Sequence, residues 1–228
     1  SGSPWRSPQQ VMDRCAQPVR LAFLQWAAMF VHLRLHTEFS VVDGTCRIDD
    51  AIKAAAADGQ PAMAITDLNN MFGGLKFYKS GRGKGVKPVL GAELIMEGAP
   101  RGRESARVLA AAARVLVLVQ SKLGYHNLSE ILARGWTGNV PRGQAQAQTK
   151  WEWLQELNEG LILLSGANAG PVGQALQRGD KDGAAREALR MASLFPHRFY
   201  LELQRAGRPE DESLVVQTVQ LAARLNLP

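Results

Sequence analysis

The chain contains the run Arg114-Val115-Leu116-Val117-Leu118-Val119, in which five apolar side chains follow a cation. A short, continuous run of branched apolar residues predicts a strand that is buried on both faces. Similar runs predict further strands at 30–35, 62–66, 88–94, 161–164 and 199–203. Helical patterns lie between them, at 47–58, 71–79, 124–134, 151–157, 171–178, 181–193 and 209–225. Strands that alternate with helices predict an α/β fold with a parallel sheet or barrel.

The composition is that of an ordinary globular protein. Of 228 residues, 46% are hydrophobic and 21% charged, which excludes disordered, collagen-like and disulfide-rich classes. Cys15 and Cys46 form no C-x-x-C pair, so the sequence excludes a cysteine zinc site and suits a reducing compartment. The net charge of +6 is compatible with a nucleic-acid partner but does not establish one. The longest apolar stretch, 21–31, is shorter than the ~20 residues of a membrane span, so we expect a cytoplasmic protein without membrane contact.

We expect the first 28 residues to lie outside the fold. Ser1-Gly2-Ser3 is typical of residues added by cloning, and Met29 would be a natural start directly before a strand pattern. The segment 1–28 is therefore interpreted as an extension or a cloning-derived segment. Residues 29–228 are expected to form one domain.

Polar side chains follow several of the predicted strands, where folds of this class carry their chemistry. In His32-Leu33-Arg34-Leu35-His36, alternate residues share one strand face, so the two histidines and Arg34 should point the same way. Asp67 follows the second predicted strand and Glu93 ends the third. His36, Asp67 and Glu93 together would suit a hard or borderline cation. The structural alternatives are a core histidine and a helix N-cap at Asp67.

The glycine run Ser80-Gly81-Arg82-Gly83-Lys84-Gly85 has some likeness to a phosphate-binding loop. Such a loop should connect a strand to a following helix, whereas this run follows a helix and precedes a strand. We therefore interpret it as a flexible basic turn. Its cations and the next one along the chain, Arg82, Lys84 and Lys87, could still contact a phosphate backbone.

These motifs, taken in order, resemble the polymerase-and-histidinol-phosphatase (PHP) domain of bacterial DNA polymerase III alpha subunits. The first is Phe30-Val31-His32-Leu33-Arg34-Leu35-His36-Thr37-Glu38, within 30–44, and the next is Ala64-Ile65-Thr66-Asp67. The likeness continues at 72–78, 85–93, 124–128, 157–166, 200–203, 207–209 and 211–212. The resemblance implies a distorted (βα)7-type barrel over 29–228, which would be incomplete because its last strand, with an Asp-x-His element, would lie beyond Pro228.

Metal-binding members of the family hold a trinuclear cluster that hydrolyses phosphoesters, and the resemblance implies seven ligand positions in this chain. Three keep the family's residue: His36, Asp67 and Glu93. Four are substituted: Arg34, Leu68 and Arg114 stand where histidines are expected, and Ala167 where a cysteine is expected. We therefore expect no metal. Our hypothesis is that Arg34 and Arg114 supply the missing positive charge by pairing with Asp67 and Glu93.

The resemblance implies a catalytically inactive scaffold that supports a replicative polymerase and binds its proofreading exonuclease (epsilon) subunit within the polymerase III holoenzyme. DNA binding, Mg and nucleotidyl transfer would then belong to the whole DNA-directed DNA polymerase, and this segment would need no cofactor. The alternative is a standalone metal-dependent PHP phosphoesterase with a reduced site of His36, Asp67 and Glu93, and with His32 as a further candidate. A general nucleic-acid-binding module ranks third, because the sequence shows no basic sheet face with interleaved aromatics.

Overall fold

A computed structural model describes residues 30–98 and 112–228, so the predicted extension at 1–28 lies outside the described residues. The elements are, in chain order, α2 (Ile48–Ala57), β1 (Ala62–Ile65), α3 (Gly74–Gly83), β2 (Lys87–Ile95), β3 (Arg114–Val119), α4 (Lys122–Gly138), α5 (Trp151–Glu156), β4 (Leu161–Leu164), the 3-10 turn η1 (Ala167–Ala169), α6 (Pro171–Gln177), α7 (Lys181–Leu194), β5 (Phe199–Tyr200) and α8 (Asp211–Leu225). None of the helices in these ranges is long and apolar enough to cross a bilayer.

The predicted α/β class is confirmed. Of the predicted parallel sheet or barrel, the described residues show a mixed sheet that is parallel only in part. The five strands lie in the order β1-β2-β3-β4-β5. The outer pairs β1–β2 and β4–β5 are parallel, whereas β2–β3 and β3–β4 are antiparallel. Two helices, α4 and α5, connect β3 to β4. Together they bring the chain back beside the end of β3, so that β4 runs antiparallel to β3. The presence of a helical segment between two strands therefore does not determine whether the strands run parallel or antiparallel.

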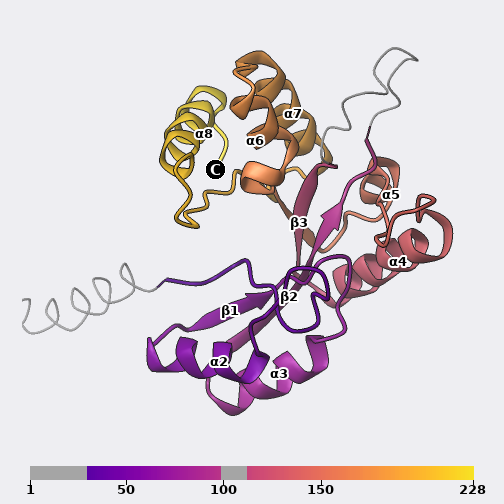
Figure 1. The fold of residues 1–228 in the computed structure, drawn as a ribbon, viewed down its shortest axis with the longest axis vertical. Helices are drawn as coiled ribbons and strands as arrows, with labels where there is room; N and C mark the ends of the chain where they lie inside the picture. Colours follow the sequence, from indigo (N-terminus) through magenta and orange to yellow (C-terminus); the bar gives the residue numbers. More distant parts are fainter. Residues whose placement is uncertain (1–29, 99–111) are drawn as a thin grey trace, which may run out of the picture.

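The sheet bends along strand β2, whose pairing changes along its length (Figure 1); beyond the end of β1, Glu93 still bonds the segment at Asp67 and Asn69. Lys87–Leu90 pair with β1, and Gly91–Ile95 pair with β3. A side chain at Gly91, where the pairing changes, would collide with the carbonyl oxygen of Val117. The bend lets side chains of β1, β3 and β4 meet on the inner face: Ala64, Leu116, Leu118 and Leu164. Among the described residues this curved sheet does not close into a barrel (Figure 1).

Helices cover the outer face of the sheet in two groups. Figure 1 shows α2 and α3 together against β1 and the start of β2, where Ile52, Ile65 and Phe77 belong to one buried cluster. Helices α4 to α8 cover the rest, and the larger cluster includes Val117 and Leu163 from the central strands. Alternate residues of β3 and β4 therefore face either the helices or the interior of the sheet, as expected for strands that are buried on both faces.

The predicted first strand, 30–35, forms no regular strand. It instead runs as an irregular edge segment beside β1, where Ala64 N donates to the carbonyl of His32 (2.8 Å) and Thr66 N to that of Leu35 (2.9 Å). An edge segment has backbone hydrogen bonds on one side only, so it departs easily from ideal pairing. The predicted last strand is likewise shortened, because only Phe199–Tyr200 pair with β4.

The glycine run is divided between a helix and a turn: Ser80–Gly83 belong to α3, so the expected turn is wrong for them, whereas Lys84 and Gly85 do form a turn before β2. Helix α3 continues to Gly83, and Val86 N donates to the carbonyl of Gly81 (3.0 Å). A Cβ at Gly81 would lie 2.9 Å from the carbonyl oxygen of Val86, so glycine permits this close approach of helix and strand. Helix α4 also extends beyond its predicted end, to Gly138.

We expect Gly91→Ala to destabilise the protein by about 1–3 kcal/mol, because the added methyl group must displace the backbone of β3. Gly83→Ala is the matched control: it adds the same group in open space in the last turn of α3, and should be neutral or stabilise by up to about 1 kcal/mol. Chemical denaturation of both variants measures the difference. Equal stabilities would show that β2 does not require the glycine at its bend.

Candidate functional site

The inner face of the bend carries a buried carboxylate, Glu93. Glu93 lies opposite Leu116 in the β2–β3 register, and Arg114 lies opposite Ile95. Alternation along β3 places Arg114 on the same face as Leu116, so its side chain and that of Glu93 are diagonal neighbours. Glu93 is only 1% exposed. A carboxylate buried to this extent needs charged partners or hydrogen bonds to stay ionised.

Three cationic or ionisable side chains surround Glu93. Arg34 Nη1 donates to Oε1, while Arg114 Nη1 and His36 Nε2 each lie 3.2 Å from Oε2. Arg34 also binds Glu202 with its other nitrogens, through Nε to Oε1 (2.7 Å) and Nη2 to Oε2 (3.1 Å). The hypothesis that both arginines pair with Glu93 is therefore confirmed. Glu202, just beyond β5, was not predicted.

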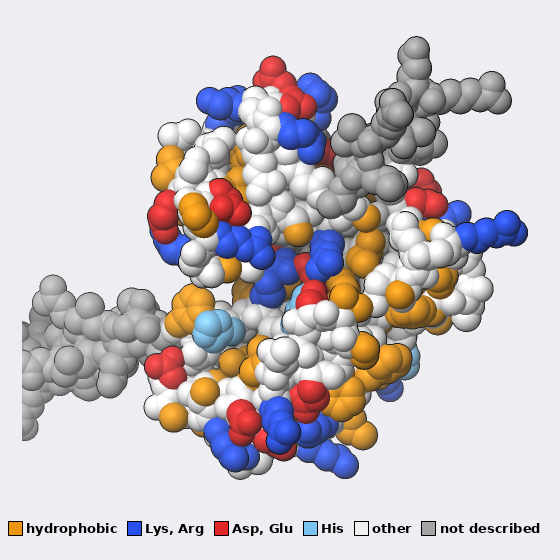
Figure 2. Space-filling view, viewed as in Figure 1, with side chains coloured by type: hydrophobic (Ala, Val, Ile, Leu, Met, Phe, Trp, Pro, Cys, Tyr) orange, Lys and Arg blue, Asp and Glu red, His pale blue; other side chains and the backbone are white. Residues whose placement is uncertain are grey.

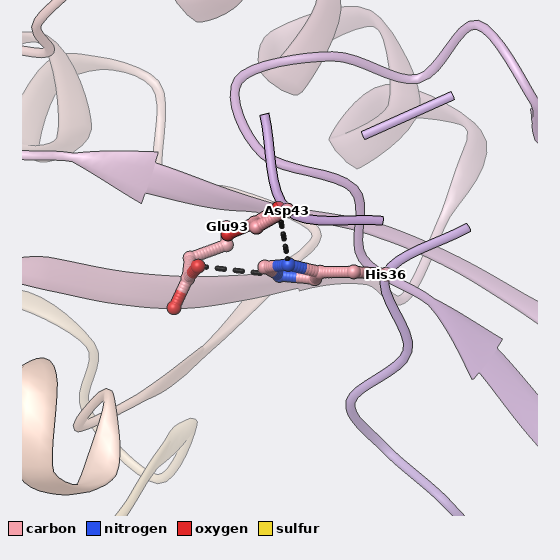
Figure 3. Close-up of side chains that lie close together, drawn as sticks. All are labelled: His36, Asp43 and Glu93. Atoms are coloured by element: carbon pink, nitrogen blue, oxygen red, sulfur yellow. Dashed lines mark hydrogen bonds and ion pairs between the residues drawn. The ribbon is translucent and has the colours of Figure 1, made fainter. Parts of the chain in front are cut away.

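Asp43 completes the group from the loop after the first edge segment. Its Oδ1 lies 2.9 Å from His36 Nδ1, and its Oδ2 lies 3.3 Å from Arg114 Nη1. Ser40 Oγ donates to the same carboxylate (2.7 Å). Figure 3 shows the ring of His36 between Asp43 and Glu93, with one ring nitrogen facing each carboxylate. We call the following six residues the ionic cluster: Arg34, His36, Asp43, Glu93, Arg114 and Glu202.

Contacts within the ionic cluster shift the pKa values of Glu93, His36 and Arg34 toward the charged forms. Burial alone would raise the pKa of Glu93, but His36 and Arg34 outweigh it and lower that pKa to about 2. Burial alone would lower the pKa of His36, yet Glu93 and Asp43 raise it above its usual value. Burial would likewise lower the pKa of Arg34, and its carboxylate partners raise it. With His36 protonated, three positive groups balance three carboxylates.

Asp67 lies outside the ionic cluster, so the expected pairing of an arginine with Asp67 is wrong. Its Oδ1 accepts from Thr37 N (2.6 Å) and its Oδ2 from Thr37 Oγ1 (2.9 Å). Burial raises the pKa of Asp67, although the bonds from Thr37 oppose the rise. The N-cap alternative is also wrong, since the N-cap of α3 is Gly73. Asp67 fastens the end of β1 to the turn that begins at Thr37.

The remaining predicted positions contribute no polar side-chain group to the ionic cluster. Leu68 is 3% exposed and carries an apolar side chain. Ala167 is buried in a left-handed conformation (φ 46°), directly after Gly166. His32 is exposed, and its ring packs edge-on against Phe30 at 4.7 Å between centroids. Arg82, Lys84 and Lys87 lie near the opposite end of β2 from Glu93.

One group of side chains has the composition of a metal site. His36, Asp43 and Glu93 each offer a ligand atom, and these atoms lie within 4.8 Å of one another. However, Arg34 and Arg114 contact the two oxygens of Glu93, one each. Guanidinium groups in these positions occupy the lone pairs that cations would share, and they repel positive charge. The residues present therefore do not fit a trinuclear metal centre.

Two solved structures with the same fold are described as hydrolases, and one of them is described as metal-dependent. One is a proposed metal-dependent phosphoesterase from Bifidobacterium adolescentis, with a TM-score of 0.54, 12% identity, and coverage of 88% of this chain and 85% of the other. Another is an amidohydrolase from Chromobacterium violaceum, with a TM-score of 0.57, 12% identity, and coverage of 86% and 84%. At this identity the likeness concerns the fold alone.

Sequence comparison defines the family. The PHP domain model matches residues 32–206. The DNA polymerase III alpha subunits of Pseudomonas fluorescens and Escherichia coli K12 are 43% and 39% identical to the chain, over 88% and 87% of its length. That of Neisseria meningitidis serogroup A is 43% identical over 87%. The chain belongs to the PHP domain family, and it spans only 16–17% of the length of these relatives.

We expect Arg34→Ala to destabilise the protein by roughly 3–5 kcal/mol, because it leaves Glu93 and Glu202 short of a buried partner. Arg134→Ala is the matched control, since Arg134 also binds a glutamate with two nitrogens, but at the surface with Glu156. Its loss should matter little, because water screens exposed pairs. Thermal and denaturant unfolding measure both. Similar losses of stability in the two variants would show that the ionic cluster contributes no more to stability than a surface ion pair does.

The ionic cluster should stabilise the fold most between about pH 4.5 and pH 6.5. Glu93 has a lowered pKa, so its contribution is complete above 4.5 and is lost as the pH falls toward about 2. His36 has a raised pKa, so its contribution is complete below 6.5 and is lost as the pH rises through its folded value. Thermal melting of the unaltered chain and Glu93→Gln across pH measures this. A stability difference that stays constant between pH 6 and pH 2.5 would contradict the assignment.

Proposed function

We propose that this chain is the PHP part of a DNA polymerase III alpha subunit and acts as a scaffold without hydrolase activity. The observation that carries the proposal is the contact of both Arg34 and Arg114 with the buried carboxylate of Glu93. In this interpretation His36, Asp67 and Glu93 are remnants of a metal site, and Arg34, Leu68, Arg114 and Ala167 are its substituted positions. The domain would extend over 29–228.

A hydrolytic metal centre must leave a position open for water and must hold positive charge close to the phosphate. The ionic cluster supports a different role. Its positive charge is fixed on two side chains that are already bound to carboxylates, and Arg34 joins the edge segment to β2 and to the end of β5. Such a cluster would hold three parts of the sheet together. Rigidity of this kind suits a domain that supports other parts of a larger enzyme.

The partner proposed for this scaffold is the proofreading exonuclease (epsilon) subunit, within the polymerase III holoenzyme. DNA-directed DNA polymerisation, contact with DNA at the active site and the Mg that nucleotidyl transfer requires would belong to other regions of the alpha subunit. A cytoplasmic location follows from the same proposal. The proposal is supported by the sequence identity between this chain and alpha subunits from three genera.

The second candidate is a phosphoesterase with a reduced metal site. It is favoured by one observation, the approach of ligand atoms of His36, Asp43 and Glu93 to within 4.8 Å. Such an enzyme would have to move Arg34 and Arg114 away from Glu93 before a cation could bind. The cost of separating buried charges argues against this step.

Three measurements on the purified chain test the proposal. After dialysis against zinc or manganese, we expect no stoichiometric metal in elemental analysis, and no hydrolysis of a generic phosphodiester. In gel filtration we expect the chain to elute together with the purified exonuclease subunit of the same organism. Glu156→Gln, a change at an exposed carboxylate, serves as the control for all three.

The two candidate functions give opposite results. Retained metal, with metal-dependent turnover that Glu93→Gln abolishes and Glu156→Gln preserves, would establish the phosphoesterase and contradict the scaffold. If the chain shows neither turnover nor association with the exonuclease, the proposed partner is contradicted. The proposal that the chain has no hydrolase activity would then still stand.

A further inference from the structure

A second charged feature lies in the stretch between Asp67 and Glu93. This stretch contains five cations and no acidic residue: Lys76, Lys79, Arg82, Lys84 and Lys87. All five are exposed. Lys76 pairs with Glu38, whereas the other four make no ion pair with any residue in the described ranges. Four of the five cations therefore have no carboxylate in direct contact within the described ranges.

Helix α3 places three of these cations on one solvent-facing side. Gly74, Phe77 and Gly81 are the buried residues of the helix, so Lys76, Lys79 and Arg82 project from its opposite side at intervals of three. With a rise of 1.5 Å per residue, they form a row of about 9 Å along the axis. Lys84 follows at the C-cap of α3, and Lys87 begins β2. We call the five cations the α3 basic face.

The backbone that carries this row is held firmly. Val86 is buried and donates to the carbonyl of Gly81, and Lys87 N donates to the carbonyl of Pro61 (2.9 Å). On the neighbouring helix α2, Asp49 accepts from Ser80 Oγ (2.8 Å) and keeps its charge within reach of Lys76 and Lys84, whereas Asp50 lies 3.8 Å from Lys53 Nζ. The α3 basic face thus has a fixed geometry without carboxylates bound to most of its members.

Exposed aromatic rings lie in the same helix and in the turn before it. Phe72 is 74% exposed and Tyr78 is 48% exposed. Figure 2 shows Lys and Arg side chains interspersed with hydrophobic ones over the lower edge of the molecule, where α3 lies, with some acidic side chains nearby. Cations that follow a backbone, beside rings on which bases can stack, are the features of surfaces that bind a nucleic-acid strand.

The α3 basic face is separate from the ionic cluster. Lys87 begins β2 and Glu93 lies six residues further along the same strand, which corresponds to a distance of about 20 Å. Changes at the face should therefore leave the ionic cluster intact. For the same reason, an inference about the face does not depend on whether the chain is a scaffold or a phosphoesterase.

We propose that the α3 basic face binds the phosphate backbone of a nucleic-acid strand. Lys79, Arg82 and Lys84 neutralise successive phosphates, and Phe72 and Tyr78 lie where unstacked bases can contact them. This interaction goes beyond the proposed function, because it gives the domain its own contact with nucleic acid. Binding through phosphates requires no particular base sequence, but it depends strongly on salt.

The test is fluorescence anisotropy of the chain with a labelled oligothymidylate of about 20 nucleotides, and with a duplex of equal length, across a range of salt concentrations. We expect the triple variant Lys79→Ala, Arg82→Ala, Lys84→Ala to bind the single strand at least about tenfold more weakly. The slope of log affinity against log salt should fall by about 2, since each lost phosphate contact removes about 0.7. The matched control removes three exposed cations elsewhere: Lys122→Ala, Arg178→Ala and Arg186→Ala.

The outcomes separate clearly. Weaker binding in the first triple variant and unchanged binding in the control support the proposal, and Phe72→Ala with Tyr78→Ala should then weaken binding of the single strand only. No salt-dependent binding by the unaltered chain, or equal losses in both triple variants, would overturn it. Tighter binding to vesicles of anionic lipid than to either oligonucleotide would also overturn it. If the triple variant melts early, Lys84→Ala alone is measured, with a slope change of about 0.7 expected.

Discussion

The burial of the Glu93 carboxylate constrains the whole inner face of the sheet. At 1% exposure, its charge must be met by groups brought from other parts of the chain. Arg34 comes from the edge segment, His36 from the residues just after it and Arg114 from β3. Because Arg34 also binds Glu202, the two sides of an open sheet are joined by ion pairs where a closed barrel would have backbone hydrogen bonds.

Such a network stabilises the arrangement in a particular way. Moving charges out of water costs free energy, so the net contribution of buried pairs is small even when the loss of one partner is severe. The value of the ionic cluster therefore lies in excluding alternatives: any other position of the edge segment would remove Arg34 from both Glu93 and Glu202 and leave Glu93 with Arg114 alone. Arginine suits this task, since its planar group can bind Glu93 and Glu202 at once. A metal ion would join the same carboxylates, but it would also leave the site able to catalyse a reaction.

The sequence predicted those elements that depend on local pattern. The apolar runs at 62–66, 88–94, 114–119 and 161–164 all form strands. A short apolar run can be buried in a sheet whichever strand lies beside it, so the local pattern is sufficient to predict it. Strand direction, the irregular first segment and Glu202 depend on contacts between distant residues, which local periodicity does not contain. Asp43 illustrates this: the tight turn at Gly44, packed against the carbonyl of Thr37, returns the loop to His36. An aspartate before glycine in a loop that follows a polar strand end was the available signal.

Asp67 and the α3 basic face show why residue type alone does not define a site. Asp67 follows a strand, as Glu93 ends one, yet its partner is Thr37, and its role is to hold a turn. The net charge of +6 is a sum over the chain, so it likewise does not indicate where a charged site lies. With His36 protonated the ionic cluster is balanced within itself, whereas four of the five cations between Asp67 and Glu93 lack an ion pair in the described ranges. The five cations of this stretch are therefore concentrated on one helix and the residues directly after it, and a concentrated charge attracts polyanions more strongly than the same charge dispersed.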